Sequence, residues 1–160
     1  MIKAAAILMV IAATPAFGQS SVPNPQLTPG ALNSDVTQEN IDQTICVRGW
    51  TRTIRPDEKY TYERKKFGVW QYGYPRTRLG DFEEDHFIPL GLGGHPTDAR
   101  NLWPEPRIAA DGWRADDKDL LETTLNRMVC QRQISLQEAQ AAIAVDWREA
   151  YTRFVTNRGQ

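Results

Sequence analysis

The segment 85–104 constrains the fold more than any other part of the chain. Asp85 and His86 begin a short apolar run, two adjacent glycines follow it, and Asn101 begins a second short apolar run. Apolar runs of this length, bounded by glycine and proline, are typical of short strands. A helix-forming segment starts at about Gly112. This order predicts a strand–loop–strand–helix unit that carries a carboxylate, an imidazole and a carboxamide, which suits a divalent metal ion with a general base beside it.

The same residues resemble a known family. One motif resembles the core of HNH-type (ββα-metal) endonucleases: Asp85-His86-x-Ile88-Pro89-Leu90-x-Leu92-Gly93-Gly94, followed by Asn101-Leu102. Further stretches resemble a group of small, often secreted bacterial HNH-like proteins, and together they span about residues 40–155: Cys46-x-x-Gly49-Trp50, Asn101-Leu102-Trp103-Pro104-Glu105-Pro106, Lys118-Asp119-x-x-Glu122, Glu138-Ala139-Gln140 and Asp146-Trp147.

The resemblance implies an α+β fold with a ββα-metal hairpin–helix core, flanking helices and a metal-dependent endonuclease activity on DNA, RNA or both. His86 is the candidate general base, because the pKa of an unperturbed imidazole lies near working pH. In the family, the residue that matches Asn101 either orients that histidine or binds the metal, and its role here stays open. Arg100, with Arg55 as a more distant alternative, is the candidate that stabilises charge on the phosphate.

Asp85 is the first candidate metal ligand, since Mg²⁺ prefers carboxylate oxygen and keeps several waters. Mg²⁺ is the expected ion, with Mn²⁺ and Zn²⁺ as alternatives. HNH nucleases place a second histidine or asparagine in the first turn of the helix, but this chain has only His86 and His95. Asp116, near the helix start, is the candidate substitute. A carboxylate there also suits the positive end of a helix without any metal.

The first 18 residues have the features of a secretory signal peptide: Lys3, an apolar run from Ala4 to Ala13, and small residues before Gln19. Export favours a disulfide between the two cysteines, Cys46 and Cys130, over two separate buried thiols. The expected localisation is periplasmic or secreted, with no membrane insertion after cleavage.

The domain boundaries follow from composition. Residues 19–40 are rich in Ser, Pro, Asn, Gln and Thr, which predicts a flexible leader, and residues 41–157 are expected to form the nuclease domain. An extended segment is predicted at 47–56, and helices at 60–70 and 113–130. A capping-box pattern at Ser135 predicts the start of a last helix.

The charge of the chain is close to balanced, with 19 basic and 20 acidic residues, so overall charge does not indicate nucleic acid. Its distribution is uneven, because Arg48 to Arg78 contains nine basic and three acidic residues. A basic segment beside an acidic centre fits a nuclease, although an ordinary mixed surface explains it equally well. The candidate nucleic-acid contacts are Arg55, Arg64, Lys65 and Lys66.

Two alternative functions remain open at this stage. The missing helix histidine suggests a catalytically inactive HNH-like domain of the cell envelope that binds a partner. The second alternative is a hydrolase that acts on another phosphoester.

Overall fold

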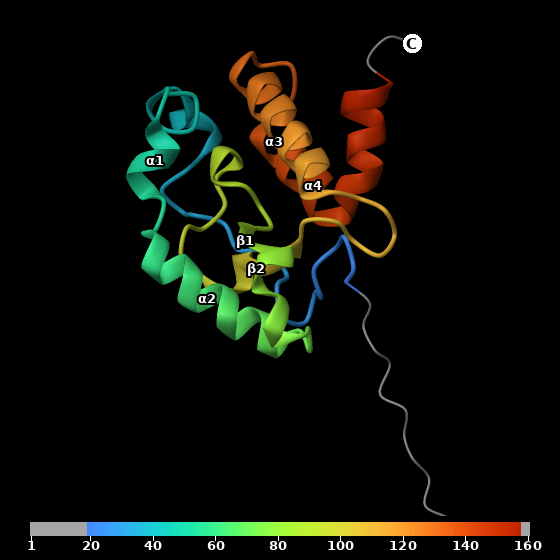
Figure 1. Ribbon diagram of the computed structural model, residues 1–160. Helices are drawn as coiled ribbons and strands as arrows, with labels where there is room; N and C mark the ends of the chain where they lie inside the picture. Colours follow the sequence, from blue (N-terminus) through green and yellow to red (C-terminus); the bar gives the residue numbers. More distant parts are fainter. Residues whose placement is uncertain (1–18, 158–160) are drawn as a thin grey trace, which may run out of the picture.

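The structure is a computed structural model that describes residues 19–157 (Figure 1), so the predicted signal peptide lies outside the described residues. It is an α+β fold, as predicted. The helices are α1 Trp50–Ile54, α2 Glu58–Gln71, α3 Ala115–Cys130 and α4 Leu136–Tyr151, and the strands are β1 Phe82–His86 and β2 Leu102–Pro106. Short helical turns complete it: η1 Gln38–Gln43, η2 Arg76–Asp81, η3 Leu90–Leu92, η4 Ala99–Asn101 and η5 Thr152–Thr156.

β1 and β2 form a two-stranded antiparallel sheet with Glu84 opposite Pro104 and Asp85 opposite Trp103. Side chains alternate between the two faces of a strand. The neighbouring residues Glu84 and Asp85 therefore point to opposite faces of the sheet, and His86 shares the face of Glu84.

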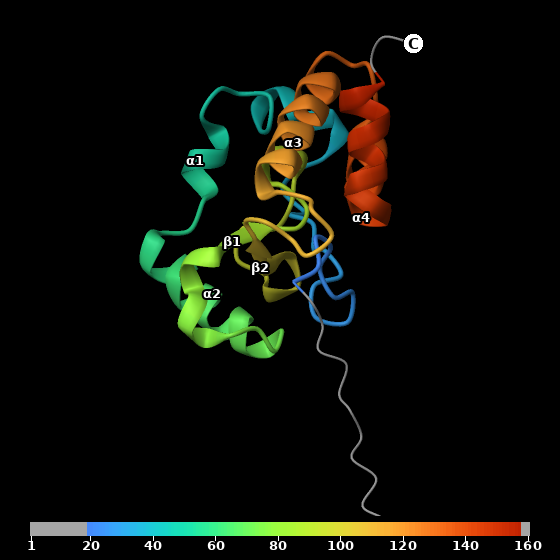
Figure 2. The ribbon, with the colours of Figure 1, turned by 45° about the vertical axis from the view of Figure 1, so that its right-hand side comes forward.

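The sheet lies between α2 on one side and the α3–α4 pair on the other (Figures 1 and 2). Helix α2 lies directly against both strands. Gly68 permits this approach, because a Cβ atom there would lie 3.0 Å from Cδ of Pro104 in β2. The helix predicted at 60–70 is therefore present, and it packs against one face of the sheet.

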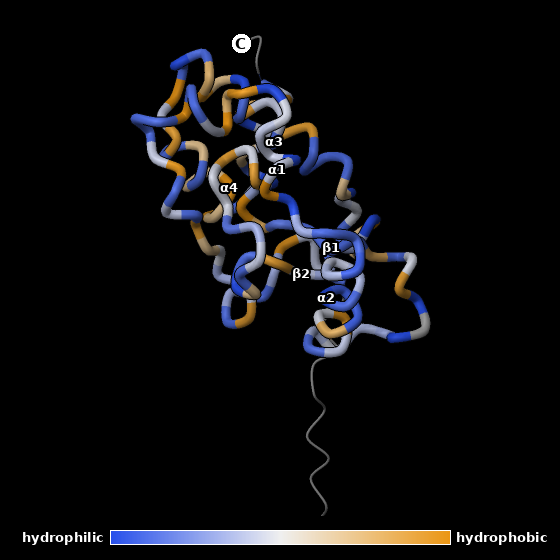
Figure 3. Tube along the Cα trace, turned by 90° about the vertical axis from the view of Figure 1, so that its left-hand side faces the viewer, coloured by the Kyte–Doolittle hydropathy of each residue, from blue (hydrophilic) through white to orange (hydrophobic). Residues whose placement is uncertain are grey.

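Helices α3 and α4 bury one apolar face each against the other and against the sheet. Leu121 and Leu125 of α3 and Ile143 and Trp147 of α4 are completely or almost completely buried, as their helical spacing predicts. Figure 3 colours the Cα trace by the hydropathy of each residue and shows that β1 is mostly hydrophilic. The side chain of Ser135 accepts a hydrogen bond from Glu138 N, so the predicted cap of α4 is confirmed.

The segment 47–56 was predicted to be extended, and this prediction is wrong. Gly49 turns the chain with φ 85°, and a short helix, α1, follows from Trp50 to Ile54. Arg55, directly after this helix, is extended with ψ 128°, because the ring of Pro56 disfavours the helical region for the residue before it. The restriction that Pro56 imposes on backbone dihedrals covers the residue before it and does not extend over the whole segment.

Residues 19–40 differ from the expected flexible leader, because they pack against the folded domain. Ser21 and Thr28 are buried. Trp147 Nε1 donates to the carbonyl of Ser21 at 2.7 Å, and Gly30 N donates to the carbonyl of Arg100 at 2.8 Å. Composition counts apolar side chains but not such backbone hydrogen bonds, which hold a polar segment in place.

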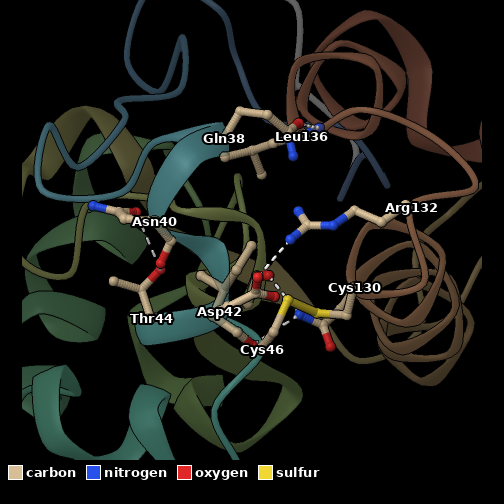
Figure 4. Close-up of a disulfide and its surroundings, with 11 residues drawn as sticks. Gln38, Asn40, Asp42, Thr44, Cys46, Cys130, Arg132 and Leu136 are labelled. Carbon is tan, nitrogen blue, oxygen red and sulfur yellow. Dashed lines mark hydrogen bonds and ion pairs between the residues drawn. A yellow bond between two sulfur atoms is a disulfide. The ribbon is translucent and has the colours of Figure 1, made fainter.

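The predicted disulfide between Cys46 and Cys130 is present and joins the segment before α1 to the last residue of α3 (Figure 4). Nearby, Arg132 Nη2 and Asp42 Oδ2 form an ion pair at 2.5 Å. Among residues 19–157, no helix combines the length and apolar character needed to cross a membrane.

Removing the disulfide should destabilise the protein, because the bond closes a loop between residues 84 positions apart. The chain-entropy relation gives about 4 kcal/mol for a loop of this size. Urea unfolding of the oxidised protein, compared with the double variant Cys46→Ser/Cys130→Ser, measures the difference. Reductant should destabilise only the wild type. A loss below 1 kcal/mol would show that the bond contributes little.

Candidate active site

Asn101 fixes the loop between the strands. Its side chain is completely buried and makes three hydrogen bonds to the backbone. Oδ1 accepts from Ile88 N at 2.8 Å, while Nδ2 donates to the carbonyl of Ile88 at 2.9 Å and to that of His95 at 3.0 Å. Asn101 makes no hydrogen bond to the His86 ring. It therefore does not orient that histidine directly, which is one of the two roles that the resemblance to HNH nucleases implies.

Gly94 makes this arrangement fit. A Cβ atom there would lie 1.7 Å from the carbonyl oxygen of Ile88 and 2.8 Å from Nδ2 of Asn101. No other residue fits without moving the backbone. The double glycine is therefore required by close packing of the loop around Asn101 as well as by the turn.

His86 is held by that loop. Its side chain lies at the end of β1, and the residue is only 4% exposed. Nε2 lies 2.9 Å from the carbonyl oxygen of Pro96. A carbonyl only accepts, so Nε2 carries the proton of the neutral ring and Nδ1 carries the lone pair. Burial lowers the pKa of His86 below its ordinary value, against the opposing effect of Asp85, and this favours the neutral, basic form.

Lys118 occupies the opposite face of β1 and was not predicted as a site residue. It comes from the second turn of α3 and is completely buried. Nζ donates to Oδ2 of Asp85 at 2.6 Å, to the carbonyl of His86 at 3.2 Å and to Oε1 of Glu122. The i, i+4 spacing of Lys118 and Glu122 is that of an ordinary surface pair, but the burial of Lys118 excludes this interpretation. Their place on the apolar stripe with Leu121 and Leu125 is the sequence signal that indicates burial.

Three carboxyl groups share the charge of Lys118. Burial opposes the charge of Lys118, but Asp85, Glu122 and Glu105 outweigh it and hold the pKa of the lysine well above its ordinary range. Burial also opposes ionisation of Asp85, yet Lys118 holds the pKa of this carboxyl below its usual value. Burial raises the pKa of Glu122 to about 8 and that of Glu105 well above its ordinary value. Lys118 therefore favours the ionised form of Asp85, while burial favours the neutral forms of Glu122 and Glu105.

The predicted metal ligands do not come together. Asp116 has a side chain that is 79% exposed and pairs with Arg114 at 3.2 Å, while Asp85 is bound to Lys118. Across residues 19–157, no three His, Cys, Asp or Glu side chains are arranged to hold a metal ion. The carboxylates have the right chemistry for Mg²⁺, but as arranged they surround an ammonium and do not fit a second cation. We derive no step through a metal, and its presence stays a prediction.

The predicted basic residues divide into two groups. Arg100 is 69% exposed and pairs with Asp98 at 2.6 Å, and the residues of α2 have partners of their own. Arg64 faces Glu84, Lys65 donates to the carbonyl of Phe82, and Lys66 pairs with Glu63. Arg55 differs from them, because its charge acts on His86 and on Asp119.

Comparisons with protein-family models, with curated proteins and with solved structures give no match. The HNH resemblance therefore stays a prediction from the motif.

Replacing Lys118 by methionine should destabilise the protein by about 3–5 kcal/mol, because it leaves buried carboxyl groups without their cation. Urea unfolding at pH 7 measures the loss, and the matched control is Lys59→Met at an exposed position of α2. Adding Glu122→Leu to Lys118→Met should restore part of the stability. A Lys118→Met protein as stable as the control would contradict the buried cluster.

A further buried carboxyl, Glu84, lies on the α2 face of the sheet and outside the Lys118 cluster. Its side chain is 3% exposed, and neither carboxyl oxygen has a hydrogen-bond partner among the described residues. The nearest cation is Nε of Arg64, 3.9 Å from Oε1. Burial raises the pKa of Glu84 to about 8, against the opposing effect of Arg64.

The variant Glu84→Gln should gain stability relative to the wild type as pH rises from about 5 to 8. In this window the folded wild type keeps a proton that the unfolded chain releases, so its stability falls with pH. The difference between the two proteins should grow by at most about 1.4 kcal/mol per pH unit. Urea unfolding at pH 5, 6.5 and 8 tests this, with exposed Glu149→Gln as control. Parallel pH profiles for Glu84→Gln and the wild type would disprove it.

Proposed function

We propose that the protein is an exported endonuclease that hydrolyses phosphodiester bonds of DNA, RNA or both, with His86 as its general base. The observation that carries this proposal is the anchoring of His86 Nε2 on the Pro96 carbonyl, which leaves Nδ1 as the free basic nitrogen. Nδ1 makes no hydrogen bond within residues 19–157, so its lone pair is not used by another described residue.

Hydrolysis of a phosphodiester requires a water molecule that loses its proton as it attacks phosphorus. A neutral imidazole with one nitrogen anchored and the other free can accept that proton in a fixed direction. A buried histidine that is merely structural normally satisfies both ring nitrogens. The unsatisfied Nδ1 therefore favours the catalytic interpretation.

The groups around His86 supply the remaining requirements. Lys118 is buried, so it acts as a positioning residue that fixes Asp85 and the backbone carbonyl of His86. Arg55 is exposed and acts electrostatically on His86, which suits a cation that stabilises negative charge on the phosphate.

The chain order β1, loop, β2, α3 supports a relation to the ββα-metal nucleases. The chain departs from that family pattern at Lys118, whose ammonium stands between carboxylates where a metal was expected. The disulfide is compatible with an extracellular or periplasmic location, which supports the proposed export.

The direct test is cleavage of plasmid DNA and of a structured RNA by the oxidised protein and by His86→Ala. Loss of a general base should lower the rate by at least about 100-fold. Circular dichroism and thermal unfolding of His86→Ala show whether the fold survives. Cleavage unchanged in a folded His86→Ala protein would exclude His86 as the base.

A metal series with Mg²⁺, Mn²⁺, Zn²⁺ and EDTA, together with Asp116→Asn, belongs to the same experiment. The observed side-chain arrangement predicts that Asp116→Asn cleaves within about 3-fold of the wild type, since the exposed Asp116 is paired with Arg114. If no nucleic acid is cut under any condition, the inactive binding domain becomes the better interpretation. Turnover of a small phosphodiester alone would favour the other phosphoesterase.

A further inference from the structure

Most arginines between residues 19 and 157 pair with an acidic side chain. Those without an ion pair or side-chain hydrogen bond to a described residue are Arg48, Arg52, Arg55, Arg76 and Arg127. Arg48, Arg55 and Arg127 line a single pocket of about 500 Å³. Unpaired guanidinium groups that converge from distant parts of the sequence indicate a site for an anion.

The pocket has three walls. One wall is the segment from Ile45 to Arg55, the second is residues 89–91 of the loop between β1 and β2, and the third is α3 from Glu122 to Cys130. Helices α1 and α3, which carry lining residues of the pocket, both lie above the sheet in the views of Figures 1 and 2. The pocket therefore adjoins the candidate active site, with which it shares Glu122.

The walls are held together by specific bonds. Cys46 and Cys130 join the first wall to the third through the disulfide. Asn126 Nδ2 donates to the carbonyl of Gly91 at 2.7 Å and to that of Ile45 at 3.3 Å, which ties α3 to both other walls. The arginines are thus carried on a preformed frame, which reduces the cost of ordering them when an anion binds.

The charge of the pocket is positive. Glu122 is the acidic residue among the described lining residues, and it is already bound to Lys118. Thr51 and Thr123 add hydroxyl groups. Guanidinium groups with hydroxyl donors bind phosphate oxygens well, because the planar fork of arginine matches two oxygens at once.

We infer that this arginine pocket binds the phosphodiester backbone of a nucleic-acid strand next to the phosphate that is attacked by the water molecule activated by His86. This inference deepens the proposed function, on which it rests, by assigning the path of the substrate. It also moves the nucleic-acid interface from Arg64, Lys65 and Lys66 of α2 to Arg48, Arg55 and Arg127. The strand would run from the end of β1 along the groove between α1 and α3.

The test compares two double variants that lose the same charge. Arg48→Gln/Arg127→Gln removes two pocket arginines, and Arg52→Gln/Arg76→Gln removes two unpaired arginines outside the pocket. Arg55 is left in place, because its charge also acts on His86. Binding of a fluorescent single-stranded oligonucleotide is measured by anisotropy at several salt concentrations, with His86→Ala in every protein to prevent cleavage.

The pocket variant should bind the oligonucleotide at least 10-fold more weakly than the parent. Its plot of log affinity against log salt should be shallower by about 1.4, the value for two lost phosphate contacts on a single strand. The control variant should stay within about 3-fold of the parent. Equal losses in both variants, or no loss in either, would overturn the inference.

Two further outcomes separate this inference from the proposed activity. Loss of binding in the pocket variant of a protein that cuts nothing would support the pocket and contradict the nuclease. If the protein cleaves nucleic acid and its pocket variant still binds the oligonucleotide normally, the result would support the nuclease and contradict the pocket. If the pocket variant loses binding to heparin but keeps its affinity for the oligonucleotide, the pocket is a site for a sulfated polysaccharide and the nucleic-acid assignment is overturned.

Discussion

The contact on which the site depends is the one between the buried ammonium of Lys118 and β1. Its bonds to the Asp85 carboxylate and to the carbonyl of His86 join α3 to the strand that carries the candidate base. A buried charge is tolerated only when it is paired and hydrogen-bonded, so Asp85 and Glu122 hold Lys118 in one position. The position of α3 relative to β1, and with it one wall of the arginine pocket, follows from this cluster.

A second constraint acts from the loop. Asn101 binds the backbone at Ile88 and His95, and Gly94 leaves room for that contact. The loop is therefore closed on itself just where Pro96 presents its carbonyl to His86. Lys118 fixes the backbone of His86 from one face, and the loop fixes its ring from the other. This opposition gives the imidazole a defined orientation with one free nitrogen.

Much of the fold could be predicted from local patterns. The α2, α3 and α4 helices, the strand β2, the cap at Ser135 and the Cys46–Cys130 disulfide all follow from periodicity, turn residues and export. The first strand was predicted wrongly: it was expected to begin at Asp85, but β1 ends at His86, and the apolar run after it forms the loop and the turn η3. The site could be predicted less well. His86 was selected as the candidate base without any sign that it is buried at the end of β1. The contacts of Asn101, the pairing of Arg100 and the burial of Lys118 likewise depend on segments that meet only after folding. Composition likewise could not predict that residues 19–40 pack, because backbone hydrogen bonds leave no signal in it.

The sequence by itself determined the longer helices α2, α3 and α4 and the strand β2, since dihedral preference and apolar spacing are local properties. It also determined which residue types meet at the motif. Only the tertiary structure decided which charges are neutralised within the chain and which stay free. Lys118 lies in a segment that contains both acidic and basic residues. Its ammonium is already paired with Asp85 and Glu122, so it is not available to bind a ligand. Arg48 and Arg127 are far apart in sequence, yet the disulfide and Asn126 bring their walls together. Pairing depends on distance in space, and sequence fixes that distance only through the packing of the whole chain.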